Sequence, residues 1–285
     1  MAFRTQRMWT VARTDLRQLF ESKDFWVPMA LLGGFFFLIV PAFLLLVIAN
    51  VGNVGAVQQV SQALDLLPQS AQQAVPTVTS SGAEVDPATQ VNYTLAVYLF
   101  APIAVVVPLT ISSAVGASTI VGERERGTGE FLAHSPADTR EIYLGKLIAS
   151  LIPGYITTVV GFGAYSLLVN IVVGGDLGYW FFPTSSWWLL IAWVLPPFLA
   201  LALSLVLRLS ARVRSTAAAQ QATGLVTLPL IIIAYGQSTG ALIGSGTATL
   251  SLILGAVAWT IAIISLATGV RSIKRASLLG VANEQ

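Results

Sequence analysis

The sequence predicts an all-α polytopic membrane protein with six transmembrane helices, an N-terminal amphipathic interfacial helix, and cytoplasmic N- and C-termini. Three observations support this class. Of the 285 residues, 55% are hydrophobic and only 10% are charged, whereas a soluble domain carries about 25% charged residues. The apolar residues form long charge-free runs. The basic residues fall in every second connection between those runs.

Residues 1–24 form a basic leader that we expect to be a cytoplasmic connecting helix. Its apolar side chains recur at helical spacing: Met8, Trp9, Ala12, Leu16, Leu19 and Phe20. The arginines fall mostly on other faces of the helical wheel. This pattern favours a helix that lies in the cytoplasmic headgroup region, and an ordinary basic segment beside the membrane is the alternative. The leader and the apolar run after it are both too long for a cleaved signal peptide.

Residues 25–285 are expected to form the transmembrane domain. A span needs about 20 apolar residues, and six runs qualify, at roughly 25–49, 95–120, 147–173, 187–207, 217–236 and 248–270. The first run holds sixteen Leu, Ile, Val or Phe residues, which contribute about −5 to −10 kcal/mol to insertion. The three alternate connections, 50–94, 174–186 and 237–247, carry no Lys or Arg. The positive-inside rule therefore places both termini in the cytoplasm.

Two external connections have features of their own. The segment 50–94 is the longest, and Val57–Leu67 is expected to form a short helix that ends at Pro68. The segment 237–247 mixes glycine with hydroxyl side chains. It suits a re-entrant hairpin, whose backbone must be buried in protein or face water, and it suits a plain external loop equally well.

Several kinds of chemistry are excluded or disfavoured. Without cysteine there is no disulfide and no thiolate ligand, and a lone histidine, His134, argues against a zinc site. No GxxxxGK[ST] phosphate loop occurs, because Gly145-Lys146 is followed by Leu147. A net charge of +2 does not indicate a nucleic-acid surface. We therefore expect no catalytic residue, no metal site and no nucleic-acid partner, and any uphill work must draw energy from another protein.

The cytoplasmic connection 121–146 concentrates the charge. Its start, VGERERGTGE, holds five charged residues in ten positions. Residues 123–126 suit a charged end of the second helix, 127–129 allow a change of direction, and 130–132 suit a short amphipathic piece stopped at Ser135-Pro136. Asp138 or Thr139 can cap the next helix. A surface that carries both acidic and basic side chains suits docking onto a cytosolic protein. A solvated loop whose charges only fix the topology explains the pattern equally well.

The run GERERGTGEFLAHSPADTREIYLGK closely resembles the first cytoplasmic connection of type-2 ATP-binding-cassette (ABC) transporter permeases. Their pattern is E-[RK]-E-R-G-T-x-E, apolar residues, S/T-P, a polar turn, then R-x-E-I-x-x-G-K. A second stretch, Ala211–Gln221 followed by Leu228-Pro229-Leu230, is similar to the family's approach to a proline-containing fifth span. The leader, the six spans and the inside termini also match, so the resemblance covers essentially the whole chain.

The resemblance implies the membrane-spanning permease subunit of an ABC-type exporter. Two such chains, as a homodimer, would form the translocation pathway in the lipid bilayer, and two copies of a separate ATP-binding subunit would drive it. This chain would hold no cofactor, and ATP and magnesium would bind the partner ATPase. The residues expected to dock the ATPase subunit are Glu123, Arg124, Glu125, Arg126, Thr128, Glu130, Phe131, Leu132, Ser135 and Pro136.

The resemblance also places the pathway between the second and fifth spans of the two chains. Candidate lining residues are Gln220, Gln221, Thr223 and Thr227. An amide is costly in lipid, so these side chains should face water or protein, and helix–helix hydrogen bonding is the alternative. The substrate stays open among amphipathic drugs, peptides, lipids and ions. Alternative functions are a non-transporting membrane scaffold and a stand-alone facilitator. The Arg-rich composition fits the inner membrane of a GC-rich bacterium, by association.

Overall fold

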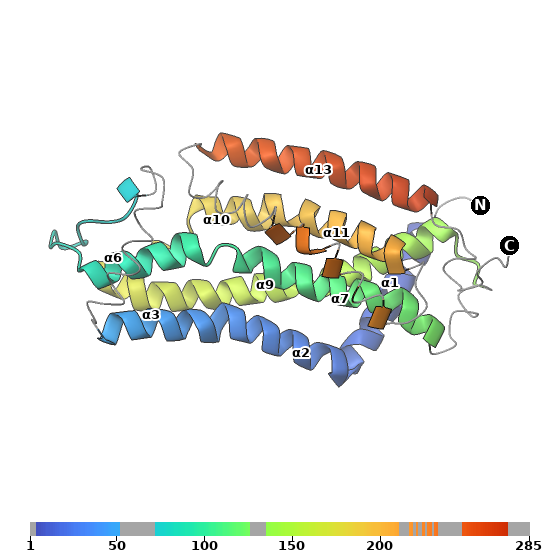
Figure 1. Ribbon diagram of the computed structural model, residues 1–285, viewed down its shortest axis with the longest axis horizontal. Helices are drawn as coiled ribbons and strands as arrows, with labels where there is room; N and C mark the ends of the chain where they lie inside the picture. Colours follow the sequence, from blue (N-terminus) through green and yellow to red (C-terminus); the bar gives the residue numbers. More distant parts are fainter. Residues whose placement is uncertain are drawn as a thin grey trace.

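The computed structural model describes residues 4–51, 72–125, 135–210 and 247–272, together with 217–218, 221, 224–225, 227–229 and 231–232. In this part of the chain there is no β-strand, only an isolated bridge between Val78 and Glu84. The long apolar helices run roughly along the long axis of the molecule, and α1 crosses one end of the bundle (Figure 1). The all-α class predicted from the sequence is confirmed for these residues.

The leader and the first span meet at an elbow. Helix α1 (Thr5–Glu21) ends at Ser22, whose backbone is extended, and α2 (Lys23–Gly34) starts immediately after it. The helix continues through a π-helical turn, η1 (Phe35–Ile39), and α3 (Val40–Val51). The stretch Lys23–Asn50 is long and apolar enough to cross a membrane, in agreement with the predicted span 25–49.

The second helical stretch starts before its apolar run. Asp86 accepts a hydrogen bond from the Ala88 amide and caps α6 (Pro87–Thr94), with proline at the favoured first position. The stretch continues through η2 (Leu95–Leu99) and, after a turn, α7 (Ile103–Glu125). The helix therefore begins at Pro87, although the predicted span begins at residue 95. The cap sets the start of the helix, whereas the apolar run sets only its membrane part.

The third helix is the longest described element. Helix α9 (Thr139–Leu177) has 39 residues, or about 58 Å at about 1.5 Å per residue, against a hydrocarbon core of about 30 Å. Asp138 caps it in a capping box with Glu141, as one of the two predicted caps. At its other end Gly178 takes the left-handed conformation, with φ of 80°.

The remaining helices follow the predicted order. Helix α10 (Ser185–Leu189), η3 (Leu190–Val194) and α11 (Leu195–Ser210) make up the fourth stretch. Helix α13 (Thr247–Ser272) covers the predicted sixth span. The described positions within 217–236 are all helical. The rest of that span, the predicted helix Val57–Leu67 and residues 237–246 lie outside the described residues, so the count of six spans and the side of the termini stay predictions.

Four of the described stretches are long and apolar enough to cross a membrane: Lys23–Asn50, Pro87–Gly122, Thr139–Leu177 and Ser185–Ser210.

An aromatic cluster fills the core between α6, η2, α9 and α10. Trp187 donates its indole N–H to the Val97 carbonyl at 2.9 Å, and Tyr165 donates its hydroxyl to the Ala96 carbonyl at 2.7 Å. These bonds satisfy the polar atoms of two side chains that are almost completely buried.

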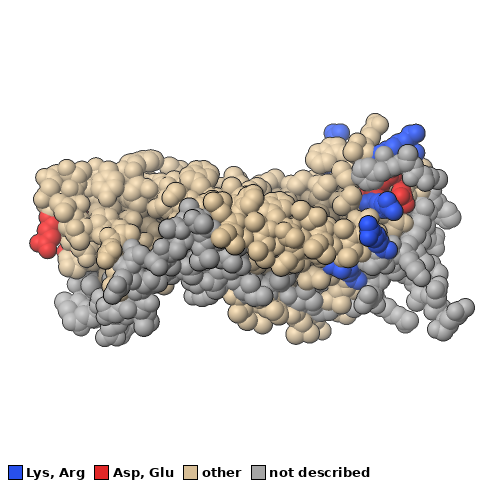
Figure 2. Space-filling view, turned by 90° about the horizontal axis from the view of Figure 1, so that it is seen from above, with Lys and Arg blue, Asp and Glu red and all other residues tan. Residues whose placement is uncertain are grey.

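Charge is distributed unequally between the two ends of the molecule. Among the described residues, every Lys and Arg lies at Arg4 or in α1, at the start of α2 or α9, or at the end of α7, α11 or α13. We call this the basic end. The opposite, acidic end carries Glu84, Asp86 and Asp176. Figure 2 shows the charged atoms at the two ends, with an uncharged band between them on the face in view. This band is the part of the molecule that suits the bilayer.

Candidate functional site

Five of the predicted docking residues are described, and these five lie at the basic end. Helix α7 reaches Glu125, so Glu123, Arg124 and Glu125 lie in its last turn, as the sequence predicted for a charged helical end. Arg126, Thr128, Glu130, Phe131 and Leu132 lie outside the described residues. Ser135 and Pro136 are described and lie just before the capped start of α9.

Helix α1 is bound directly to the second half of this connection. The backbone amide of Arg4 donates to Glu141 Oε1 at 2.6 Å, and Arg7 Nη1 donates to the Pro136 carbonyl at 2.6 Å. Glu141 also accepts from the Asp138 amide at 2.9 Å. It lies before the predicted span 147–173, and these two amide donors lower the pKa of its carboxyl group. The start of α1 is therefore tied to the connection by its backbone and by a side chain.

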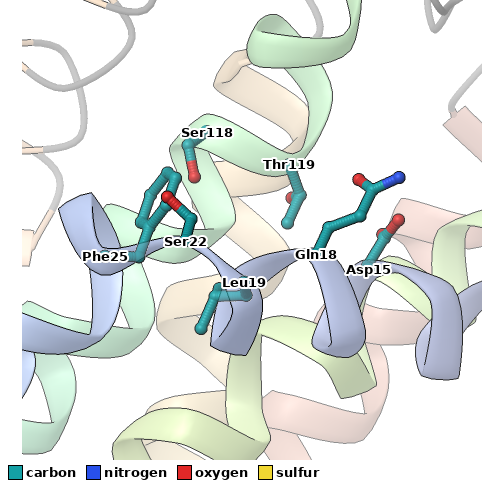
Figure 3. Close-up of a pocket in the computed structure, with 7 residues that line it drawn as sticks. All are labelled: Asp15, Gln18, Leu19, Ser22, Phe25, Ser118 and Thr119. Atoms are coloured by element: carbon teal, nitrogen blue, oxygen red, sulfur yellow. The ribbon is translucent and has the colours of Figure 1, made fainter.

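The elbow between α1 and α2 encloses a small cavity of about 90 Å³ against α7. Five polar side chains line it: Asp15, Gln18, Ser22, Ser118 and Thr119. Leu19 and Phe25 supply its apolar walls. Figure 3 shows the residues of α1 and α2 on one side and those of α7 on the other. None of the described residues that line this cavity is Lys, Arg or His.

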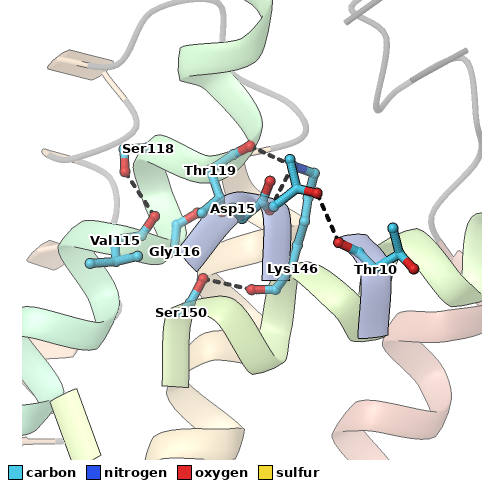
Figure 4. Close-up of polar contacts among 9 residues, drawn as sticks. Thr10, Asp15, Val115, Gly116, Ser118, Thr119, Lys146 and Ser150 are labelled. Atoms are coloured by element: carbon cyan, nitrogen blue, oxygen red, sulfur yellow. Dashed lines mark hydrogen bonds and ion pairs between the residues drawn. The ribbon is translucent and has the colours of Figure 1, made fainter. Parts of the chain in front are cut away.

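Next to the cavity a buried ammonium group joins three helices (Figure 4). Lys146 of α9 has a side chain only 2% exposed, and its Nζ lies 3.2 Å from Asp15 Oδ2 of α1. The same Nζ donates to the Thr119 carbonyl of α7 at 2.8 Å. Packing is close here, because a β-carbon added at Gly145 would lie 2.8 Å from the Met8 carbonyl oxygen. The ion pair therefore fixes α1 against α7 and α9, the two helices that flank the charged connection.

A second polar network joins α9, α11 and α13 at the basic end. Ser204 Oγ accepts from the Tyr143 hydroxyl at 3.1 Å and donates to the Ser265 carbonyl at 3.0 Å. Arg208 donates to the hydroxyls of both serines. Such hydrogen bonds between helices hold polar groups inside an apolar bundle. The predicted sixth helix is thereby attached to the third and fourth.

The predicted pathway residues are only partly described. Gln221 is exposed, whereas Thr227 is 7% exposed and is thus buried within its own chain. Gln220 and Thr223 lie outside the described residues. Most of the second stretch is buried within the chain, and the exposed residues among positions 103–122 of α7 are Thr110 and Ala114. The described residues therefore do not test whether a pathway lies between the second and fifth spans.

Sequence reasoning missed the ion pair, although the signal was present. Lys146 counted only as a cytoplasmic charge that set the topology. In the leader, Met8, Ala12, Asp15 and Leu19 share one face at a spacing of three and four residues, and this face packs inward. An acid within an otherwise apolar stripe predicts a buried cationic partner, because an unpaired buried carboxylate is costly.

The fold and the site together define a polytopic α-helical membrane protein whose basic end carries an ordered helical attachment to its longest charged connection. A family model described as ABC-2 family transporter protein matches residues 9–250. The chain therefore belongs to the ABC-2 family of transporter proteins and is the membrane subunit of an ABC transporter. No curated protein matches the chain.

Proposed function

We propose that this chain is the permease subunit of an ABC-type exporter, in which two copies form the translocation pathway and two separate ATP-binding subunits supply the energy. The observation that carries the proposal is the family match over residues 9–250, which includes most of α1 and the whole charged connection. The sequence contains no phosphate-binding loop, so ATP and magnesium belong on the partner subunits. The chain itself catalyses no reaction in this proposal.

The docking surface in this proposal is the connection 121–146 at the basic end. A topology signal needs only Arg and Lys, because acids contribute little to it. Glu123, Glu125 and Glu130 are nevertheless interleaved with arginines, an arrangement that supplies charge complementarity to a partner. The bonds from Arg7 to Pro136 and from Arg4 to Glu141 support a mechanical role. A displacement of the connection would be passed to α1 and α9 together.

The pathway in this proposal lies between two copies of the chain. Gln220, Gln221, Thr223 and Thr227 remain its candidate lining residues. Helix interfaces in membranes favour small and hydroxyl side chains, and the exposed positions of α7, Thr110 and Ala114, are of this kind. A cargo that passes here would meet hydroxyl, amide and aromatic groups, because the predicted cores of the spans carry no charge. Such a surface suits an amphipathic cargo better than a strongly charged one.

Charge reversal in the last turn of α7 tests the proposal. The double variant Glu123→Lys/Glu125→Lys adds two basic residues to the segment, which strengthens the cytoplasmic signal and so keeps the topology. We expect normal insertion, together with at least tenfold weaker co-purification of the ATP-binding subunit and a matching loss of transport-coupled ATP hydrolysis. Like charges placed opposite each other at an interface cost several kcal/mol. The measurements are affinity co-purification and ATPase activity in proteoliposomes.

The matched control is Glu84→Lys, an exposed acid at the acidic end. Asp86 is unsuitable as a control because it caps α6. Unchanged binding and transport in the double variant would contradict docking through residues 123–130 and favour the alternative, a solvated loop whose charges only fix the topology. Binding of the ATPase without any transport by the wild-type complex would favour the scaffold, and transport without an ATPase would favour the facilitator.

A further inference from the structure

Three polar side chains of the cavity at the α1–α2 elbow, Asp15, Ser118 and Thr119, present acceptors, whereas Gln18 and Ser22 can also donate. Thr119 donates its hydroxyl proton to the Gly116 carbonyl at 3.0 Å, and Ser118 donates to the Val115 carbonyl at 2.9 Å. Figure 4 shows the Ser118 bond running back along α7. Both hydroxyl protons are donated to carbonyl groups of α7, so only the oxygen lone pairs of these side chains are available to a ligand in the cavity. Two of its walls therefore act as acceptors.

The carboxylate of Asp15 adds a third acceptor and the only formal charge among the lining residues. Its Oδ2 accepts from Lys146 at 3.2 Å. Its Oδ1 accepts no hydrogen bond from any residue in the described part of the chain, although the side chain is only 10% exposed. This oxygen is not completely buried, so it is accessible to a donor from outside the chain. A ligand that brings N–H groups would satisfy it.

The position of the cavity points to the headgroup layer. Phe20 and Trp26 flank the elbow and are exposed, at 49% and 41%. Exposed aromatic side chains at the end of a span favour the boundary between membrane and water. The cavity thus opens where α1 leaves the predicted cytoplasmic surface and α2 enters the bilayer (Figure 3).

Size and wall chemistry narrow the ligand further. A volume of about 90 Å³ has room for a small polar group, since one water needs about 10–15 Å³ of such space. The Phe25 ring and the Leu19 side chain give the apolar surface that methylene groups need, and an aromatic face also attracts an ammonium group. An anion is disfavoured, because the described lining residues include a carboxylate but no basic side chain, and the ammonium group of neighbouring Lys146 is already paired with that carboxylate.

We propose that this cavity binds the primary ammonium group of an ethanolamine-type headgroup, with its N–H groups donating to Asp15, Ser118 and Thr119. The shared chemistry is a primary amine on a short carbon chain. Its source is either a phospholipid of the cytoplasmic leaflet or a soluble amine. The site is separate from the charged connection and does not depend on the proposed ATPase partner.

Native mass spectrometry of the purified full-length chain tests the site. The chain is incubated with phosphatidylethanolamine or with phosphatidylcholine of identical acyl chains, whose quaternary nitrogen has no N–H to donate. We expect the ethanolamine lipid to be retained at least tenfold more strongly. The variants Ser118→Ala and Thr119→Val should each reduce this preference several-fold, since each removes one acceptor of a charged hydrogen bond. Thr119→Val keeps the backbone carbonyl that Lys146 uses.

Thr110→Val is the matched control. Its hydroxyl also bonds back along α7, to the Val106 carbonyl at 2.8 Å, but Thr110 does not line the cavity. It should leave the preference unchanged. Competition with millimolar ethanolamine separates the two sources: displacement of the lipid indicates that the soluble amine suffices, and persistence shows that the lipid chains are needed. Equal retention of both lipids by the wild-type chain, or an undiminished preference in both cavity variants, would overturn the proposal.

Discussion

Lys146 holds its ammonium group inside the protein with one carboxylate and one backbone carbonyl as partners. Its Nζ is within 3.2 Å of Asp15 Oδ2 and within 2.8 Å of the Thr119 carbonyl. A buried charge is tolerated only when it is paired and hydrogen-bonded. This pair differs from the ion pair of Arg17 and Glu21 on the same helix, whose side chains are 79% and 62% exposed. Burial decides which of the two pairs matters for stability.

Removal of one partner of the buried pair should destabilise the chain strongly. The variant Lys146→Met leaves the Asp15 carboxylate buried without its cation, and we expect a loss of about 3–5 kcal/mol in unfolding free energy. The double variant Asp15→Asn/Lys146→Met removes both charges and should recover most of that loss. Thermal and denaturant unfolding in detergent measure both effects.

The control is Arg17→Met, which breaks an exposed ion pair and should leave the unfolding free energy almost unchanged. Equal losses in Lys146→Met and in Arg17→Met would contradict a structural role for the buried pair. A double variant no more stable than the single variant would show instead that the methylene stem of the lysine, and not its charge, carries the stabilisation.

Part of the site was predictable from the sequence because it is encoded locally. The cap at Asp138 and the charged helical end at Glu123–Glu125 follow from residue types at fixed spacing, and both are present. The pairing of Lys146 with Asp15 joins residues 131 positions apart. This ion pair forms only because α1 packs against α9, and no local sequence pattern predicts that packing. The position of Asp15 in the apolar stripe of the leader predicts a basic partner, but it does not identify Lys146 as that partner.

At the scale of elements, prolines account for the interruptions in three membrane helices. The π-helical turns Phe35–Ile39, Leu95–Leu99 and Leu190–Val194 each lie just before a proline, at Pro41, Pro102 and Pro196. A proline supplies no N–H to the carbonyl four residues earlier, and in each case that carbonyl belongs to the π-helical turn. Pro28, Pro108 and Pro153 lie inside helices without such a turn. Proline in the sequence therefore does not by itself predict where a membrane helix contains a π-helical turn.

Close packing of α7 on α9 depends on Gly154. A β-carbon at this position would lie 2.6 Å from the Pro108 carbonyl oxygen and even closer to the Ser112 hydroxyl. Because a backbone atom cannot move aside cheaply, Gly154→Ala should separate the two helices and cost about 1–3 kcal/mol of unfolding free energy. Unfolding in detergent measures the loss. The control is Gly163→Ala on the same helix, where an added β-carbon meets nothing within 4 Å. This variant should have an unchanged or slightly higher unfolding free energy. Equal losses in the two variants would contradict the close approach of α7 and α9 at Gly154.

At the scale of the whole molecule, the separation of charge agrees with a chain that crosses the membrane in one orientation. The described basic residues gather at one end, and Glu84, Asp86 and Asp176 lie at the other (Figure 2). Periodicity and charge predicted this arrangement well, because the bilayer imposes both on the sequence. They predicted helix ends less well. Helix α9 begins at Thr139 and the predicted span at residue 147, because the first turns of α9 extend beyond the apolar run.

Cysteine labelling tests the orientation of the whole chain. The natural sequence has no cysteine, so Ser80→Cys and Ser135→Cys each introduce one unique thiol, and the unmodified chain is the blank. The Ser80 amide bonds to the Leu177 carbonyl at the last residue of α9, whereas Ser135 lies just before the first. The two positions are thus separated by the full length of α9, about 58 Å at about 1.5 Å per residue, which exceeds the hydrocarbon core of about 30 Å. With a membrane-impermeant maleimide, the thiol at position 80 should react in intact cells, and the thiol at position 135 only in inverted vesicles. Reaction of both from the same side would mean that α9 does not cross the bilayer, and the basic end would then lose its assignment to the cytoplasm.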